Sequence, residues 1–256
     1  MANKVRTKEV NLLDNPYAMG PDAAVKGNFN PAKVFYMDDF FVNNETLQWT
    51  KSVGNGGVGA VTAAQNGIYR LTTNATAEDV AELEGINAEF YAQSGGITIE
   101  TRLKVNAITT VGIAAGLANA YADANNTVIA VIGGSDAVTI TTAVDLALFV
   151  FDTGADTDRW FAVSCLNGAA AQKKVCAAGI APVNATYEVQ RIDIDVLGNA
   201  TFFRNGALMG YLPLAVTPTV ALRPYFSIIS HATGRLLDID YVKVWASRRE
   251  TATVAW

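Results

Sequence analysis

The sequence predicts an all-β fold, a β-sandwich of two antiparallel sheets that follows an extended N-terminal arm. From Val34 onward the chain is a series of short apolar or alternating runs. These runs are separated by Gly, Asn and Asp clusters typical of turns, and helical periodicity is almost absent. We therefore expect an arm over residues 1–33, one sandwich domain over 34–247 and a short tail over 248–256.

The arm is predicted from its composition. It contains Pro16, Pro21 and Pro31 and shows neither helical nor strand periodicity. A disordered leader is one interpretation, but the arm carries more apolar residues than a solvated tail needs. We expect it to become ordered against a partner. Its candidate partner-binding residues are Leu12, Leu13, Tyr17, Met19 and Phe29.

The strands are predicted in order along the domain, and GGITIETRLKVNA is the clearest of them. Its apolar residues alternate with polar ones from Ile97 to Val105, which is typical of a half-buried antiparallel strand. The Asn205-Gly206 pair is the strongest hairpin signal in the chain. A helix is expected only near 75–84. There the acidic residues Glu78, Asp79, Glu82 and Glu84 would lie in a solvated turn or a short helix.

The charge and hydropathy of the chain exclude several classes of function. The net charge of -5 and the pI near 4.9 exclude nucleic-acid binding through a basic surface. The sequence has no apolar run long enough for a signal peptide or a membrane span, so we expect folding in the cytoplasm and no membrane partner. Charged residues make up only 17% of the chain and hydrophobic residues 50%, which favours a large core and burial against neighbouring copies.

Residues that could carry metal or acid–base chemistry are few. Cys165 and Cys176 could face each other across a hairpin, but without a secretory signal two reduced thiols are favoured. Two Cys and a single His argue against a Cys/His zinc site. His231 precedes small residues in a turn, so a loop or edge histidine is expected rather than a general base.

Two Asp-Ile-Asp stretches raise the question of carboxylate chemistry. Asp193 and Asp195 are expected on the solvated face of a half-buried strand, opposite a core face of Ile192, Ile194 and Val196. Paired carboxylates at this spacing can act on glycosidic bonds, but a polar structural face is the simpler interpretation.

The second stretch lies near the C-terminus. Asp238 and Asp240 are expected to share a face with Leu236, Val242 and Val244, near the edge of the sandwich. There the carboxylates could accept backbone hydrogen bonds, pair with Arg235 or Lys243, or bind calcium, which prefers oxygen ligands. Asp240 is the candidate calcium ligand, and no other cofactor is expected.

Sugar binding is a further hypothesis, because aromatic rings stack on pyranose faces. Core or interface positions are the favoured interpretation for each aromatic residue taken alone. The candidates are Trp49, Tyr91, Tyr121, Trp160, Tyr225 and Tyr241.

Four segments together resemble a known superfamily. They are FYMDDFF, GGITIETRLKV, RIDIDVLGNATFFRNGALMG and the closing LDIDYVKVW. This order is similar to the concanavalin A-like (lectin/glucanase, laminin G-like) jelly roll, over residues 35 to 247. The resemblance implies the fold and does not bring a function with it. Laminarinase-type glycosidases of this superfamily carry Glu-x-Asp-x-x-Glu or Glu-x-Asp-x-Glu on one strand, and no such run occurs here.

A non-catalytic jelly roll, an apolar arm and a low-charge surface together favour a structural protein of a bacteriophage virion. Sandwich domains of this type resemble the capsid decoration (cement) proteins of tailed bacteriophages. The resemblance implies a protein that is made in the host cytoplasm, forms a homo-oligomer, with a trimer favoured, and binds the major capsid protein or another virion protein. A carbohydrate-binding, receptor-binding module of a tail fibre or spike, with a glycan partner, is the alternative. A degenerate glycoside hydrolase is the third hypothesis.

Overall fold

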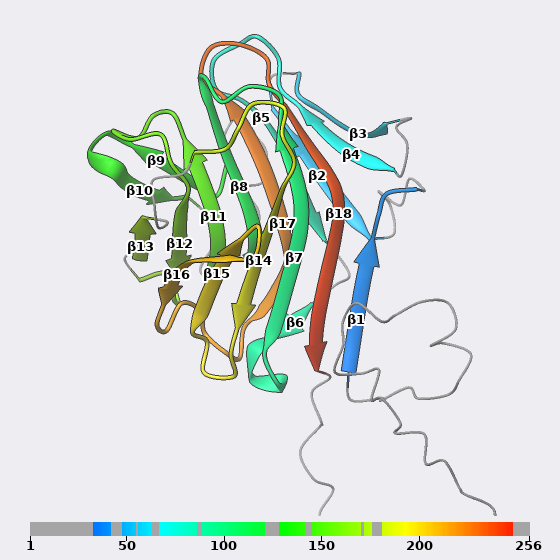
Figure 1. Cartoon of the computed structure of the whole chain (residues 1–256), viewed down its shortest axis with the longest axis vertical. Coiled ribbons are helices and arrows are strands. Elements are labelled where there is room, and N and C mark those ends of the chain that lie inside the picture. Colours follow the sequence, from blue (N-terminus) through cyan, green and yellow to red (C-terminus); the bar gives the residue numbers. More distant parts are fainter. Residues whose placement is uncertain are drawn as a thin grey trace, which may run out of the picture.

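The computed structural model describes residues 33–41, 48–54, 56–62, 67–85, 89–120, 128–141, 145–169, 172–175 and 181–247. They form two packed antiparallel sheets of eight strands each, with a separate two-stranded hairpin (Figure 1). The predicted two-sheet sandwich is therefore confirmed. No helix among these residues has the length and apolar character needed to cross a membrane.

The first sheet has seven strands in a row, with an eighth beside its long closing strand. The row is β16 (Ala207–Leu212), β15 (Ala200–Arg204), β14 (Glu188–Ile194), β7 (Ile97–Val105), β18 (Leu236–Ser247), β4 (Ile68–Thr72) and β3 (Val58–Thr62), and β1 (Lys33–Asp38) pairs with β18. Because β18 is long, β4 pairs with its first residues and β1 with its last ones.

The second sheet has the same plan. Its row is β13 (Gln172–Val175), β12 (Phe161–Cys165), β11 (Leu146–Asp152), β8 (Val111–Ala118), β17 (Ala221–Ser230), β5 (Asp79–Gly85) and β2 (Trp49–Val53), and β6 (Phe90–Tyr91) pairs with β17. A short 3-10 turn, η2 (Ala92–Ser94), follows β6.

The main core fills the space between the sheets. Alternate residues of each strand point into it, as Ile97, Ile99 and Leu103 do from β7. The packing is tight at Gly116 of β8, where an added Cβ would lie 2.4 Å from the carbonyl oxygen of Ala147 in β11 and 2.7 Å from Cδ1 of Ile192 in the other sheet. A larger side chain there would therefore displace β11 or Ile192.

A second apolar cluster lies on the outer face of the second sheet. The hairpin of β9 (Ala130–Gly133) and β10 (Ala137–Ile140), joined by η3 (Gly134–Asp136), covers this face. Ile129 and Ile132 pack there against Leu148 and Phe161. The hairpin thus gives part of the second sheet an apolar cover on both faces.

The helix expected near residues 75–84 is wrong, and the solvated turn is confirmed only for the exposed residues 75–78, which include Glu78. Residues 79–85 form β5, which lies between β17 and β2 and is buried along its whole length. Ala81 and Leu83 point into the main core, so tertiary pairing outweighs the weak strand propensity of Ala and Glu.

The face expected for the closing Asp-Ile-Asp stretch also needs correction. A β-bulge between Ile239 and Tyr241 shifts the register of β18 against β7. The bulge changes the alternation, so Leu237, Ile239, Val242 and Val244 all lie in the core. Asp238 therefore points away from the face of the two valines.

Candidate functional site

The outer face of the first sheet is covered by ion pairs at its centre. The carboxylate of Asp238 accepts hydrogen bonds from Arg70 at 2.6 and 2.9 Å and lies 3.0 Å from Nζ of Lys104. Burial alone would raise the pKa of Asp238, but the hydrogen bonds from Arg70 and Lys104 outweigh it and hold this pKa below its usual value. The expected partners Arg235 and Lys243 are not those observed, because Arg235 binds the backbone and side chains of Thr109 and Thr110.

Asp240 continues this network. Its Oδ2 lies 2.6 Å from Nη1 of Arg102, and the Arg102 guanidinium stacks over the ring of Tyr187 at 4.2 Å. Lys104 approaches the same ring at 4.6 Å. The part of the chain that the structure describes has no group of three or more His, Cys, Asp or Glu placed to hold a metal ion. Calcium binding by Asp240 stays a prediction.

The first Asp-Ile-Asp stretch divides between a strand and a turn. Asp193 lies on the outer face of β14 and pairs with Arg191 at 2.8 Å. Asp195 lies beyond the end of the strand, where it accepts hydrogen bonds from the backbone of Leu197 and Asn199 at 2.8 and 3.0 Å. The slight burial of Asp195 opposes these bonds, yet they lower its pKa. Both carboxylates thus have structural partners, and the predicted solvated face is confirmed for Asp193. The core position expected for Val196 is wrong, because β14 ends at Ile194 and Val196 lies in the turn that follows, where it is 49% exposed.

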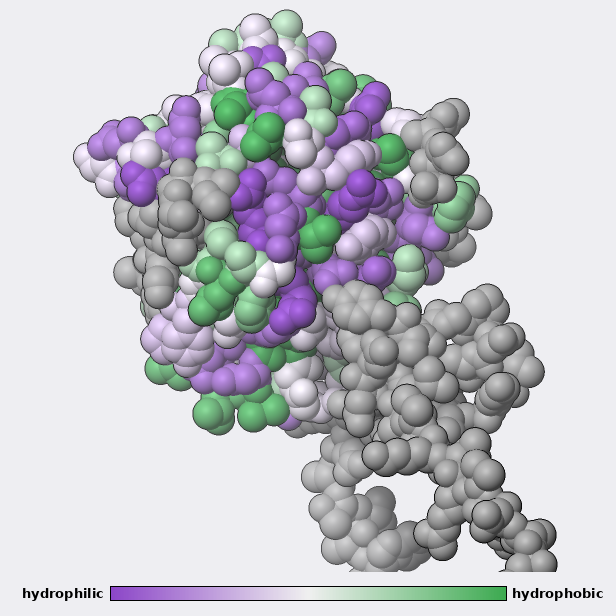
Figure 2. All heavy atoms as spheres, in the orientation of Figure 1, coloured by the Kyte–Doolittle hydropathy of each residue, from purple (hydrophilic) through white to green (hydrophobic). Residues whose placement is uncertain are grey.

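An apolar patch interrupts this polar face at its β16 edge. It consists of five exposed side chains, and Figure 2 shows hydrophobic residues along the lower rim of the face. Leu208 and Tyr211 of the patch lie on β16, and the other three residues lie in two turns. These turns are held together, because Leu214 donates its N–H to Oδ1 of Asn199 and Ala215 donates to the carbonyl of Gly198. The patch residues, with their exposed fractions, are Val196 (49%), Leu197 (64%), Leu208 (58%), Tyr211 (46%) and Leu214 (57%).

The second sheet carries a buried acidic row on its outer face. Glu82 and Glu84 of β5 are 1% and 2% exposed and lie beside Tyr225 and Arg223 of β17. The Tyr225 hydroxyl donates to Glu82, and Nη1 of Arg223 lies 3.2 Å from Oε1 of Glu84. Burial raises the pKa of Glu84, against the opposing effect of Arg223. The sequence offered no signal for this row, since the segment was expected to be solvated.

Among the central strands of that face, the only buried acid within the described residues is Asp152, at the end of β11. Leu146, Leu148 and Val150 of β11 lie under the β9–β10 hairpin and are fully buried. The acidic row thus lies only at the β5–β17 side of the sheet. Without an Asp between or beyond its two Glu residues, it also lacks the Glu-x-Asp-x-Glu spacing.

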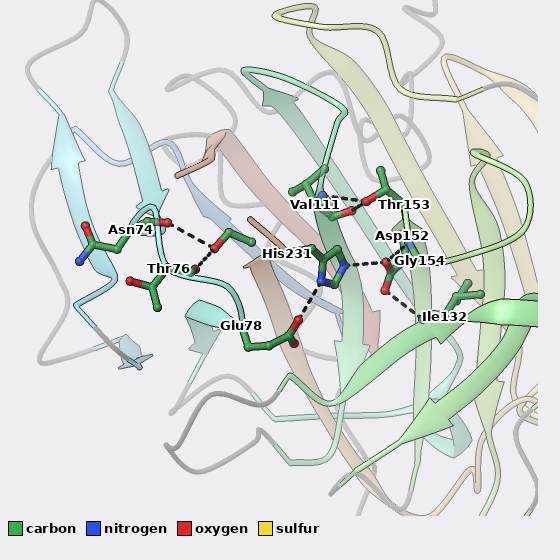
Figure 3. A network of polar contacts seen from close by, with 10 residues as sticks. Asn74, Thr76, Glu78, Val111, Ile132, Asp152, Thr153, Gly154 and His231 are labelled. Atoms are coloured by element: carbon green, nitrogen blue, oxygen red, sulfur yellow. Dashed lines mark hydrogen bonds and ion pairs between the residues drawn. The ribbon is translucent and has the colours of Figure 1, made fainter. Parts of the chain in front are cut away.

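His231 links three turns at one end of the sandwich (Figure 3). Its Nε2 lies 2.8 Å from Oδ1 of Asp152, and its Nδ1 lies 3.2 Å from Oε1 of Glu78. Asp152 also accepts hydrogen bonds from the backbone of Gly154 and of Ile132 in β9. The hydrogen bond to Asp152 is the main cause that raises the pKa of His231 to about 9. The imidazole is therefore protonated at neutral pH and forms an ion pair, as befits a structural residue rather than a general base.

Three of the six candidates for stacking on sugars are inside the protein. Trp49, Trp160 and Tyr225 are at most 1% exposed, which confirms the core interpretation for these three. Tyr91 and Tyr241 are partly exposed, and Lys243 covers the Tyr241 ring at 4.1 Å.

Several predicted residues lie outside the described part of the chain. They are Tyr121, Cys176 and the arm residues Leu12, Leu13, Tyr17, Met19 and Phe29. Cys165 is a buried free thiol whose pKa is raised by burial.

Comparison with solved structures identifies many proteins of the same fold. The β-glucanase of Bacillus licheniformis is 15% identical with a TM-score of 0.58, over 84% of this chain and 98% of the glucanase. The potassium-bound carbohydrate recognition domain of Emp46p is 12% identical with a TM-score of 0.51, over 80% of this chain and 93% of that domain. Protein SO2946 of Shewanella oneidensis MR-1, of unknown function, is 11% identical with a TM-score of 0.54, over 92% of this chain and 97% of that protein.

These likenesses confirm the concanavalin A-like jelly roll at the level of fold. At this identity they show the fold alone. No family model matches the chain, and no curated protein matches it.

Proposed function

We propose that this chain is a non-enzymatic structural protein of a bacteriophage virion, a capsid decoration protein that binds the head through its arm and its sandwich edges. The apolar patch is the observation that carries the proposal. Five large apolar side chains stand exposed at one edge of a face whose centre is covered by ion pairs. Grouped exposed apolar residues of this kind mark protein–protein contacts.

Two further features support a binding role without catalysis. The carboxylates of Asp193, Asp195, Asp238 and Asp240 hold neighbouring cations or turns. The hairpin that covers β11 fills part of the outer face of the second sheet with apolar side chains. A glycosidase needs two carboxyl groups free to face a bound sugar across a glycosidic bond.

The decisive experiment is a protein inventory of purified virions by mass spectrometry, with binding assays on particles that lack the protein. We expect stoichiometric incorporation, and we expect a variant that lacks residues 1–33 to lose particle binding. As a matched control, deletion of the tail residues 250–256 should have the smaller effect. Absence of the protein from virions, or normal binding without the arm, would contradict the proposal.

Carbohydrate binding is the second candidate, and an aromatic pair favours it. Phe35 and Trp245 lie next to each other on β1 and β18 with ring centroids 5.7 Å apart. Both side chains are partly exposed. A flat ring beside polar groups is a common surface for a pyranose.

A glycan array at millimolar ligand concentrations tests this candidate. Binding that is lost in Trp245→Ala and kept in Tyr211→Ala would support it. An array without hits would count against it.

The hypothesis of a degenerate glycoside hydrolase is tested in the same preparation by incubation with β-glucans, followed by reducing-end analysis. We expect no release of reducing ends.

A further inference from the structure

The arm and the apolar patch start from opposite edges of the first sheet. Residue 33 begins β1, which pairs with β18, and Lys33 lies opposite Ser247. The arm and the tail therefore leave the sandwich from neighbouring positions. The patch lies along β16, with β15, β14, β7 and β18 between it and β1. Five inter-strand steps of about 4.8 Å place the two edges roughly 24 Å apart.

The arm and the sandwich also differ in charge. Residues 1–33 contain five Lys and Arg against three acidic residues, and the tail contains Arg248 and Arg249 against Glu250. Residues 34–247 contain twelve Lys and Arg against twenty Asp and Glu. The arm is thus basic and apolar, whereas the sandwich is acidic and exposes an apolar patch beside Asp193 and Asp195. The two surfaces are complementary in both respects.

We propose that the arm of one copy of this chain covers the apolar patch of the next copy. Residues Leu12, Leu13, Tyr17, Met19 and Phe29 would supply the apolar contacts. An arm that crossed this face to the patch of its own sandwich would pass over the ion pairs of Lys243 with Glu100 and of Arg191 with Asp193, which lie near the end of the sheet where the arm leaves. Covering those charges with apolar residues is unfavourable, which favours a contact between copies.

The arrangement is head-to-tail, because the arm leaves one edge and the patch lies at the other. Contacts of this kind close into rings when the rotation between copies permits it. We expect a ring of three copies. This inference deepens the proposed function, since it states what covers the patch, but it concerns the isolated protein and can fail while virion incorporation succeeds.

Light scattering after size-exclusion chromatography measures the mass of the assembly. We expect three times the 27.2 kDa of one chain for the full-length protein. Deletion of residues 1–32, or the double substitution Leu197→Glu and Leu214→Glu, should each give monomers. Val58→Glu is the matched control, because Val58 is also exposed (53%) but lies on β3 away from the patch. Unchanged thermal unfolding of each variant shows that the sandwich is intact.

A mixing experiment distinguishes contacts between copies from contacts within one copy. The arm-deleted protein keeps its patch, and the patch variant keeps its arm. If the arm binds a neighbour, equimolar mixing should give a complex of one chain of each kind. Two separate monomer peaks after mixing, a monomeric full-length protein, or an oligomer that survives arm deletion would overturn the proposal.

Discussion

At the scale of single residues, His231 makes the stability of the protein depend on pH. Its pKa of about 9 in the folded state lies above the usual 6.5, because Asp152 and Glu78 favour the protonated ring. The ion pair therefore stabilises the fold fully below pH 6.5, and this contribution is lost as the pH rises through 9. We expect the free energy of unfolding to fall by about 1–3 kcal/mol over this range. Urea unfolding at several pH values measures it, and His231→Gln should remove most of the dependence.

The buried side chain of Gln190 is expected to lower the free energy of unfolding. Gln190 of β14 is 2% exposed, and within the described residues neither atom of its amide has a hydrogen-bond partner. A buried amide without partners costs about 1–3 kcal/mol. Gln190→Met keeps the volume and removes the polar atoms, so we expect it to raise the free energy of unfolding by about 1 kcal/mol. A clear loss of stability in chemical denaturation would show that the amide has a role.

At the scale of elements, the β9–β10 hairpin is held to the second sheet by apolar contacts. Ile132 is 1% exposed within the cluster that includes Leu148 and Phe161. We expect Ile132→Ala to lower the free energy of unfolding by about 2–4 kcal/mol, since it leaves a cavity under the hairpin. The exposed Thr139 on the same hairpin is the control, and Thr139→Ala should change stability by less than about 0.5 kcal/mol. Equal effects of the two substitutions would show that the hairpin is not held in this way.

At the scale of the whole molecule, a buried polar group connects the two sheets. Glu188 of β14 forms an ion pair with Arg204 of β15 and accepts a hydrogen bond of 3.1 Å from the indole of Trp160, just before β12. Glu188→Gln should cost about 3–5 kcal/mol, because it leaves the buried Arg204 without a counter-charge. Arg191→Ala breaks a partly exposed pair with Asp193 and should cost less than about 1 kcal/mol. Thermal unfolding of both variants compares the two pairs.

The local pattern of the sequence determined the sandwich and many of its strands. The alternation predicted the core faces within β7 and β14 correctly, because a strand that is half-buried must repeat every two residues. It failed at Val196, which lies beyond the end of β14 and is exposed. The turn at Asn205-Gly206 was predicted for a similar local reason, and both residues have positive φ there.

Long-range pairing decided the rest. The sequence of β5 is typical of a solvated acidic segment. Only the position of the strand between β17 and β2 buries Glu82 and Glu84. The bulge in β18 moved Asp238 to the outer face, where residues 134 and 168 positions away in the chain supply its cations. The sequence by itself determined which residues of a strand alternate between the core face and the outer face. The tertiary structure decided which strands lie side by side, because hydrogen bonds between strands join residues distant in the chain and leave no local pattern.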